Sequence, residues 1–317
     1  MSAPLIETRK LVKYFTTPRG ALHAVDKVDL KIERGQVLGV VGESGCGKST
    51  LGRTILRLTE PTGGDILYDG VSYLKYSEKE MNELRKKIQI IFQDPYSSLN
   101  PRMTIGQIIA EPIKVCKTIT GKKAIDEKVL EMMDLVGLSR RWINAYPHEL
   151  DGGRRQRVGI ARALVLEPSF IVCDEPVSAL DVSIQAQILN LMMDLQRDMG
   201  LTYMFITHDL SVVKHISNYI MVMYLGQCVE SAAPEELFKN PLHPYTVALL
   251  NAIPRPNLSF RNRERKIIKG EVTNPINPKP GCRFASRCPR VSDKCLQQDP
   301  PLKEVGQNHM VACTLYE

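Results

Sequence analysis

The sequence lacks the long apolar runs that would place it in a membrane. No stretch approaches the roughly 18 uninterrupted apolar residues of a bilayer-spanning helix, and residues 1 to 10 lack the apolar core of a secretory signal. We therefore expect a cytosolic chain, whose membrane role, if any, depends on partner subunits that supply the spanning helices. With 43% hydrophobic and 24% charged residues, the composition excludes a disordered or fibrous chain.

Positive charge exceeds negative charge only modestly. The chain has 42 Lys and Arg against 35 Asp and Glu, a formal net charge of +7. The densest basic run, between residues 255 and 269, has the composition of a linker. Diffuse surface charge explains the excess, and no nucleic-acid partner is expected.

The cysteines divide into two sets. Four of the eight are scattered, whereas the other four fall within the last 36 residues, at Cys282, Cys288, Cys295 and Cys313. Because cytosolic thiols stay reduced, disulfides are a poor explanation of this second set. Metal binding is the preferred interpretation.

Apolar periodicity indicates an α/β fold with an appendage. Alternation within residues 3 to 35 predicts half-buried antiparallel strands, and the apolar run of residues 36 to 42 predicts a strand covered on both faces, followed by a helix over residues 48 to 58. Further buried strands are predicted at residues 169 to 174 and 202 to 207, joined by a helix over residues 184 to 199.

The predicted organisation has two domains. Residues 1 to 253 form the first, with a mostly helical subdomain inserted at about residues 95 to 166. From about Pro254 the composition shifts to Pro, Arg and Asn, which indicates a linker at the start of a C-terminal extension, residues 254 to 317. No internal repeat is present.

A phosphate-binding pattern joins the buried strand to its helix. The motif G-x-x-x-x-G-K-[ST] is satisfied by Gly42, Glu43, Ser44, Gly45, Cys46, Gly47, Lys48, Ser49 and Thr50. Glycines let backbone N–H groups surround the phosphates of ATP, Lys48 reaches the β and γ phosphates, and the Ser49 hydroxyl can coordinate Mg²⁺. A chance glycine turn is the alternative, and the position between an apolar strand and a helix disfavours it.

Two carboxylates follow the second buried strand. Asp174 would hold Mg²⁺ through water, and Glu175 would polarise the water that attacks the γ phosphate. An Asp-Glu pair at a strand end is often only a solvated turn, but its presence together with the phosphate loop favours catalysis.

These motifs, in this order, resemble the ATP-binding cassette (ABC) family, a P-loop NTPase fold with a RecA-like core, an antiparallel β arm and a helical subdomain. The resemblance implies that Gln93 contacts Mg²⁺, senses the γ phosphate and links the site to membrane subunits. It implies that His208 contacts the γ phosphate and that Asp181 contacts an opposing subunit. It also implies an aromatic residue stacked on adenine, for which Phe15 is favoured slightly over Tyr14.

One segment departs from the family pattern. Where the family has Leu-Ser-Gly-Gly-Gln, this chain has Leu150, Asp151, Gly152, Gly153 and Arg154. In the family the segment binds the γ phosphate held by the other subunit of a dimer. A carboxylate at Asp151 would repel that phosphate unless it is compensated, for example by Arg154. The prediction is one weakened site and a paralogous ATPase partner, hence a heterodimer.

The C-terminal segment resembles ATPases of the dipeptide and oligopeptide importer group. The similarity includes residues 242 to 254 and the four tail cysteines. The group's known iron–sulfur centre favours a [4Fe–4S] cluster on Cys282, Cys288, Cys295 and Cys313, with Zn²⁺ as the alternative and unligated thiols as a third possibility. Because the tail is too short and polar for its own apolar core, the metal centre is expected to stabilise it.

The resemblance implies a motor at the cytoplasmic face of the cell membrane. Two cassettes would close around Mg-ATP and reopen after hydrolysis, driving two transmembrane permease subunits that receive cargo from an extracytoplasmic binding protein. Peptide is the expected cargo, with oligosaccharide or nickel as alternatives. The competing class is a soluble cassette ATPase acting on nucleic acid or ribosomes, which commonly has two cassettes or a large coiled-coil insertion that this sequence lacks.

Overall fold

The computed structural model describes residues 3–253 and 275–316. The predicted linker beginning at Pro254 lies mostly outside these residues. The chain divides into two compact units that interleave along the sequence. The first unit comprises Met1–Leu5, Glu33–Gln36 and Tyr73–Ile206, and the second comprises Ile6–Ile32, Val37–Ser72 and Thr207–Glu317.

The second unit contains the predicted antiparallel arm. Its four strands have the order β2-β1-β4-β5. The long strands β1 and β2 pair in antiparallel fashion, with Ile6 opposite Ile32 at one end and Thr17 opposite Gly20 at the other. Alternate side chains are buried at the C-terminal end of β2, at Val28, Leu30 and Ile32, as the alternation predicts, whereas most of β1 is only partly buried or exposed. The strands are β1 (Ile6–Thr17), β2 (Gly20–Ile32), β4 (Gly63–Tyr68) and β5 (Val71–Ser72).

The second unit also contains the phosphate-loop strand. All five residues of β3 (Val37–Val41) are buried, and β3 pairs in parallel with β9 (Tyr219–Tyr224), which confirms the strand predicted from the apolar run. On the other side of β9 the strands are antiparallel, β10 (Gln227–Ala232) and then β12 (Met310–Val311) and β11 (Lys303–Glu304). The helices are α1 (Lys48–Ile55), α7 (Leu210–Ile216), α8 (Pro234–Lys239) and α9 (Pro244–Ala252).

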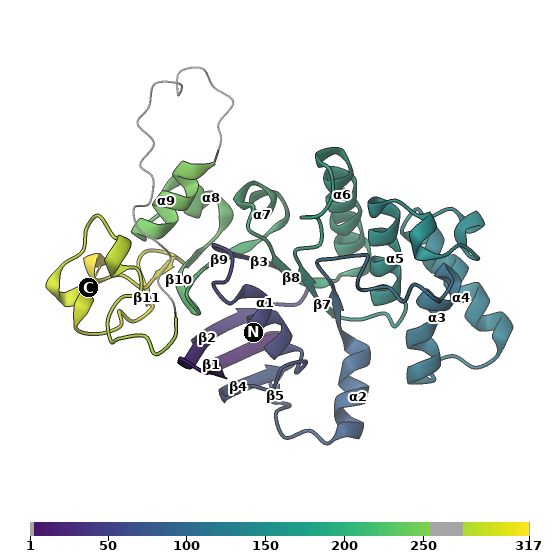
Figure 1. The fold of residues 1–317 in the computed structure, drawn as a ribbon, viewed down its shortest axis with the longest axis horizontal. Coiled ribbons are helices and arrows are strands. Elements are labelled where there is room, and N and C mark those ends of the chain that lie inside the picture. Colours follow the sequence, from purple (N-terminus) through teal and green to yellow (C-terminus); the bar gives the residue numbers. More distant parts are fainter. Residues whose placement is uncertain (1–2, 254–274, 317) are drawn as a thin grey trace, which may run out of the picture. The chain divides into compact units, whose positions relative to one another are not determined.

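The first unit has a parallel sheet and a group of helices. Strands β6, β7 and β8 pair in parallel in that order, which confirms the two predicted buried strands and adds a third. Helices α3, α4 and α5 lie against one another in Figure 1 and account for the helical stretch predicted from residue 95 onward. The strands are β6 (Ile88–Ile91), β7 (Phe170–Asp174) and β8 (Thr202–Ile206). The helices are α2 (Glu78–Lys87), α3 (Ile105–Cys116), α4 (Lys122–Leu135), α5 (Gly152–Leu164) and α6 (Val182–Met199).

The C-terminal segment shares the apolar core of the second unit. Phe284 is 1% exposed and packs in one cluster with Val41 of β3, Tyr224 of β9 and Tyr245 of α9. Strand β12 adds to the sheet beside β10, and the buried His309 ring lies 2.7 Å from the buried Glu230 carboxylate. The segment therefore does not form an apolar core of its own, as expected, but packs into an existing one, a source of stability that the sequence did not indicate.

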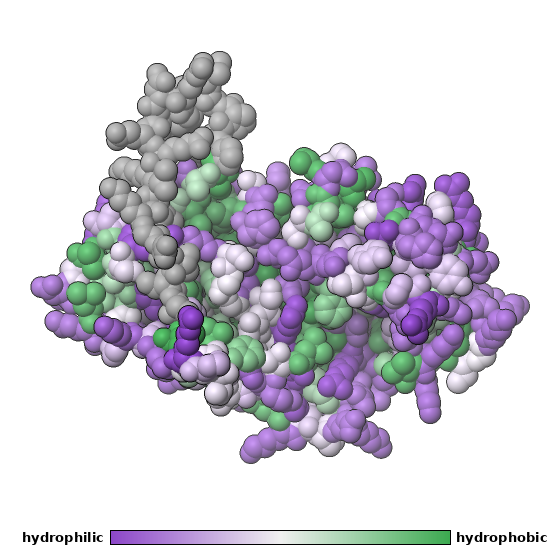
Figure 2. Space-filling model, viewed as in Figure 1, coloured by the Kyte–Doolittle hydropathy of each residue, from purple (hydrophilic) through white to green (hydrophobic). Residues whose placement is uncertain are grey.

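Hydrophilic side chains predominate over α3, α4 and α5 on the face drawn in Figure 2. Within residues 3–253 and 275–316, no helix is both long and apolar enough to span a membrane.

Candidate functional site

The phosphate loop requires glycine at positions where the backbone turns sharply and packs closely. Gly47 has φ of 101° at the start of α1, and a Cβ atom there would lie 2.0 Å from the carbonyl oxygen of Ala24. A Cβ atom on Gly42 would lie 2.2 Å from the carbonyl oxygen of Met223. Because the loop passes so close to the neighbouring backbone, only glycine fits at these two positions. A glycine-rich loop of this kind can present its backbone N–H groups to phosphates.

The loop lysine is already held in place by the loop itself. Lys48 Nζ donates hydrogen bonds to the carbonyl oxygens of Gly42, at 2.8 Å, and Glu43, at 3.0 Å. Lys48 is buried, so its charge is presented from within the loop rather than from a mobile surface chain. Ser49 follows it in the first turn of α1, with Thr50 next. This arrangement is suited to binding the phosphates of a nucleotide.

The first unit brings together Gln93 and the carboxylate pair. Gln93 Nε2 donates to Glu175 Oε2 at 2.9 Å, and Asp174 is the buried last residue of β7. Glu175 has φ of 47°, a conformation that non-glycine residues rarely adopt, and its N–H donates to the Ile206 carbonyl at 2.9 Å. Strained backbone at such a position is typical of functional sites, where the fold holds a side chain in a required direction.

Two further predicted residues lie at the ends of helices or strands. Asp181 precedes α6 and accepts hydrogen bonds from the Ile184 N–H, at 3.0 Å, and the Ser183 hydroxyl, at 2.7 Å. These bonds, that of Ser183 foremost, hold the pKa of Asp181 below its ordinary value. His208 belongs to the second unit, where it is exposed just before α7.

The segment that departs from the family pattern, residues 150–154 and here called the altered segment, forms the start of α5. Asp151 accepts the Arg154 N–H at 2.8 Å, and its carboxylate also forms an ion pair with the Arg154 guanidinium. A Cβ atom on Gly153 would lie 2.6 Å from the Ile184 side chain, so this glycine permits close packing against α6. Asp151 is therefore a helix cap with a partner for its charge.

The two aromatic candidates for adenine stacking differ in their contacts. The Tyr14 hydroxyl donates to Asp26 at 2.5 Å, and its ring stacks on His23 with centroids 3.7 Å apart. Phe15 is 37% exposed, and Lys13 Nζ lies 4.8 Å from its ring centroid. Tyr14 is thus already engaged, whereas Phe15 has an accessible ring face.

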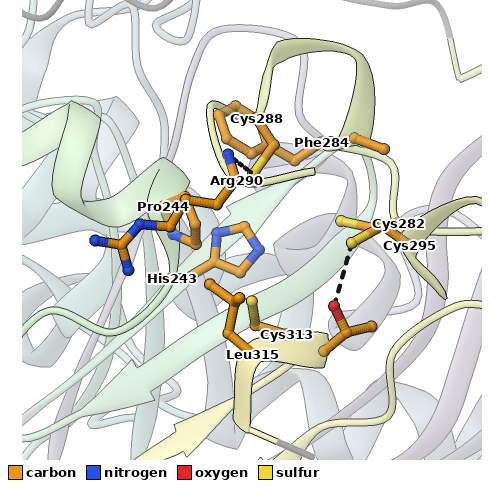
Figure 3. A pocket seen from close by; sticks show the side chains of 11 residues that line it. His243, Pro244, Cys282, Phe284, Cys288, Arg290, Cys295, Cys313 and Leu315 are labelled. Atoms are coloured by element: carbon orange, nitrogen blue, oxygen red, sulfur yellow. Dashed lines mark hydrogen bonds between the residues drawn. The ribbon is translucent and has the colours of Figure 1, made fainter. Parts of the chain in front are cut away.

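The four tail cysteines line one cavity. Figure 3 shows Cys282 and Cys295 on one side of it, with Cys288 and Cys313 above and below. His243 also lines this cavity, and burial lowers its pKa to about 4, so its ring is neutral. His243 Nδ1 accepts the Tyr245 N–H at 3.1 Å, which leaves its ring proton on Nε2.

The thiols differ in acidity. Burial raises the pKa of Cys282 to about 11 and also raises that of Cys288 and Cys313. Burial acts in the same direction on Cys295, but hydrogen bonds with Ser292 and Thr314 outweigh it and lower the pKa of this thiol. Cys295 Sγ lies 3.1 Å from Thr314 Oγ1.

The geometry does not support the predicted metal centre. Across the described ranges, 3–253 and 275–316, no three His, Cys, Asp or Glu side chains form a group that could hold a metal ion. The donor set of four thiols suits iron–sulfur or zinc chemistry, but the sulfur atoms do not converge closely enough as they stand.

Two residues that contact the phosphate loop were not predicted. Tyr245 accepts the Glu43 N–H through its hydroxyl oxygen at 2.8 Å, and Arg287 forms two hydrogen bonds with the Glu43 carboxylate. Tyr245 is 202 positions and Arg287 is 244 positions from Glu43 in the sequence. No motif links residues at such separations, and the only available signal was that both lie in the segment after the cassette.

Comparison with known families agrees with these features. The family described as "ABC transporter" matches residues 25–178, which include the phosphate loop and the carboxylate pair. The family described as "Oligopeptide/dipeptide transporter, C-terminal region" matches residues 229–295, which include Tyr245 and Arg287.

Solved structures share the cassette. A dimeric ATP-binding cassette, MJ0796, described in a post-hydrolysis state bound to ADP and Pi, is 28% identical with a TM-score of 0.67, and the match covers 72% of this chain and 98% of that one. CbiO1 from Clostridium perfringens, part of the ABC transporter complex cbiONQ, is 28% identical with a TM-score of 0.66 over 75% of this chain and 92% of that one. The predicted P-loop cassette fold is confirmed.

Full-length relatives extend the similarity to the tail. The dipeptide transport ATP-binding protein DppF of Escherichia coli (strain K12) is 50% identical over 99% of this chain and 95% of its own length. The putative oligopeptide transport ATP-binding protein YkfD of Bacillus subtilis (strain 168) is 50% identical over 99% of this chain and 96% of its own. This chain belongs to the ABC transporter family, as an ATPase of the group with the oligopeptide/dipeptide transporter C-terminal region.

Proposed function

We propose that this chain hydrolyses Mg-ATP to power the import of dipeptides or oligopeptides. The observation that carries the proposal is one chain with both the phosphate loop and the peptide-transporter C-terminal region, in the order found in full-length relatives named for dipeptide and oligopeptide transport. Partners would be two permease subunits and an extracytoplasmic binding protein, with this chain on the cytoplasmic face of the membrane. Oligosaccharide and nickel are the alternative cargoes.

The test of this proposal is reconstitution. The chain would be co-purified with its permeases, inserted in liposomes, and supplied with the binding protein and labelled dipeptide. ATP-dependent uptake of the dipeptide that is competed by other peptides, but not by nickel or oligosaccharide, is the expected result. Recovery of the chain with ribosomes or DNA instead of hydrophobic multi-span subunits would refute the transporter role.

We assign roles within the ATPase site as follows. Lys48 binds the β and γ phosphates. Ser49 and Gln93 contact Mg²⁺, and Asp174 holds it through water. Glu175 polarises the attacking water, and its hydrogen bond with Gln93 provides a direct means for Gln93 to influence the catalytic carboxylate. His208 contacts the γ phosphate, and Phe15 stacks on adenine, supported by its accessible ring.

We infer that the altered segment completes a weakened site in a partner ATPase. The ion pair with Arg154 offsets the Asp151 charge, but both carboxylate oxygens are engaged and a carboxylate has no proton to donate, so the phosphate loses the hydroxyl donor that the family has here. The chain's own phosphate loop would be completed by the partner's segment. Such asymmetry favours a heterodimer with a paralogous subunit.

A mixed-dimer ATPase assay tests the weakened site. Asp151→Ser is expected to raise turnover at the partner's phosphate loop, measured with this chain's own loop disabled by Lys48→Ala. Unchanged turnover after Asp151→Ser, together with complete loss of turnover when the partner's loop is disabled in the wild-type mixture, would contradict the inference.

We also propose that the tail thiols hold a metal centre, a [4Fe–4S] cluster in preference to Zn²⁺. The support is the donor set, since Cys282, Cys288, Cys295 and Cys313 all line one cavity. The centre would be structural. Metal analysis and absorption spectra after anaerobic purification test this: brown, iron-containing protein supports the cluster, whereas colourless zinc protein or metal-free protein refutes it.

A further inference from the structure

A tail arginine neutralises a carboxylate within the phosphate loop. Arg287 Nη1 lies 2.8 Å from Glu43 Oε2, and Arg287 Nη2 lies 3.1 Å from Glu43 Oε1, so the pair is bidentate. The Arg287 side chain is only 6% exposed and that of Glu43 25% exposed. The Glu43 carboxylate holds the pKa of Arg287 above its ordinary value. A pair shielded from solvent in this way is screened far less by salt than a surface pair.

Glu43 is the second residue of a loop whose purpose is to bind anions. Its own carbonyl oxygen accepts from Lys48 Nζ at 3.0 Å, so the residue belongs to the loop's hydrogen-bond framework. A free carboxylate there would oppose the phosphates of ATP, because like charges close together in a poorly solvated site repel. The partner that cancels this charge comes from outside the cassette motifs.

The position of Arg287 is fixed by the packing of the tail. It ends a short 3-10 turn, Ala285–Arg287, whose preceding residue is the buried core residue Phe284. The Arg287 N–H donates to the Phe284 carbonyl at 3.0 Å, and Nη1 lies 3.3 Å from the Tyr224 hydroxyl. The arginine is therefore held by the core rather than by its ion pair alone.

A residue of α9, Tyr245, contacts the same loop residue independently. The Tyr245 hydroxyl oxygen accepts the Glu43 N–H at 2.8 Å, and Tyr245 packs on Tyr224 with ring centroids 4.6 Å apart. The segment after the cassette thus binds both the backbone and the side chain of Glu43. Both contacts lie within the second unit of the fold.

We propose that Arg287 is a positioning residue for ATP: it cancels the Glu43 charge beside the phosphates and holds the loop, which makes the C-terminal segment part of the nucleotide site. The proposal rests on the role of the phosphate loop in binding ATP. It requires no metal in the tail. If Arg287 only attached the tail to the loop, removing the Glu43 charge would not compensate for its loss. If Arg287 cancels that charge, removing the charge should restore ATP binding.

The experiment measures the Kd of Mg-ATP for the full chain in four forms: wild type, Arg287→Gln, Glu43→Gln and the double variant. Glutamine is chosen at position 287 because it keeps much of the side-chain volume while removing the charge. We expect Arg287→Gln to weaken binding about tenfold, and Glu43→Gln to bind more tightly than wild type because Arg287 is then uncompensated. The double variant is expected to return to within about threefold of wild type.

The matched control removes another bond of the tail. The Tyr316 hydroxyl donates to the Leu242 carbonyl at 3.1 Å, a bond that includes no residue of the phosphate loop, so Tyr316→Phe should leave the Kd unchanged. A double variant as weak as Arg287→Gln, or Arg287→Gln binding like wild type, would overturn the proposal. Wild-type chain that does not bind Mg-ATP would instead refute the proposed function.

Arg287→Lys keeps the proposal testable if Arg287→Gln does not fold. Lysine retains the positive charge but not the two-pronged geometry, and we expect its Kd to lie within about threefold of wild type. If Arg287→Lys is folded, as shown by an unchanged circular dichroism spectrum, and yet binds Mg-ATP tenfold or more weakly, charge cancellation is not the function of Arg287.

Discussion

Two glycines of the phosphate loop face different constraints. Gly47 has an unfavourable φ, and a Cβ atom there would also lie 2.0 Å from the Ala24 carbonyl oxygen, whereas Gly45 has φ of 78° and open space around it. We expect Gly47→Ala to lower the free energy of unfolding by about 3 kcal/mol and to abolish ATP binding, because the clash adds to the backbone strain. Gly45→Ala should cost about 1 kcal/mol, from strain alone.

Urea unfolding of the two alanine variants, with nucleotide titration of each, checks the comparison. Equal losses of stability would mean that the approach to Ala24 does not constrain the loop. In that case the backbone conformation alone would explain why glycine occurs at position 47.

Glu175 is the residue proposed to polarise the attacking water. Its hydrogen bond from Gln93 and its strained backbone orient the carboxylate, and Glu175→Gln preserves the side-chain shape while removing the proposed base. We expect ATP turnover to fall by about 10² to 10⁴-fold with Mg-ATP affinity nearly unchanged. Steady-state hydrolysis and equilibrium binding, with the exposed Glu127→Gln on α4 as control, separate the two effects. A parallel loss of binding would assign Glu175 to nucleotide binding rather than hydrolysis.

At the scale of elements, Asp151 has a structural role that can be separated from its effect on a phosphate. It caps α5 through the Arg154 N–H, so Asp151→Ala should lower the free energy of unfolding by about 1 kcal/mol. Asp151→Ser should cost less than half as much, because serine is also a good N-cap. Urea denaturation of the monomeric chain measures both values. Equal losses for Ala and Ser would show that the ion pair with Arg154, not the cap, stabilises the helix.

Elements with a clear apolar pattern were predictable from the sequence, and contacts were not. The runs that became β3 and β7 are buried along their whole length, which is the property their composition indicates. The helix predicted to reach residue 58 ends at Ile55, because Arg57 adopts φ of 50°. Strand β6 was missed, since four residues with two of them only partly buried give little periodicity.

The candidate site was predicted where a motif concentrates it in a few adjacent residues. The phosphate loop and the carboxylate pair are such motifs. The Arg287 pair with Glu43 joins residues 244 positions apart, and nothing in local composition marks either partner for the other. The same limit explains why the packing of the tail into the core was not predicted: its apolar partners, such as Tyr224, lie in a different part of the sequence.

At the scale of the molecule, the C-terminal segment is a structural component of the second unit. Phe284 lies 5.3 Å from Tyr224 and 5.5 Å from Tyr245 between ring centroids, in the cluster that also contains Val41 at the end of the phosphate-loop strand. Arg283, one residue earlier, pairs with Asp26 of β2. Loss of Phe284 should therefore destabilise both the tail and the strand that leads to the phosphate loop.

We expect Phe284→Ala to lower the free energy of unfolding by about 3 to 5 kcal/mol, the usual cost of removing a buried aromatic ring. Leu296→Ala is the control, because Leu296 is 61% exposed and should change stability by less than about 0.5 kcal/mol. Hydrogen exchange then locates the effect. If the tail and the core form one cooperative unit, amides of β3 and β9 exchange faster in Phe284→Ala together with those of the tail. Faster exchange confined to residues 281–316 would show that the tail folds separately, and Arg287 would then depend on a docking equilibrium to reach Glu43.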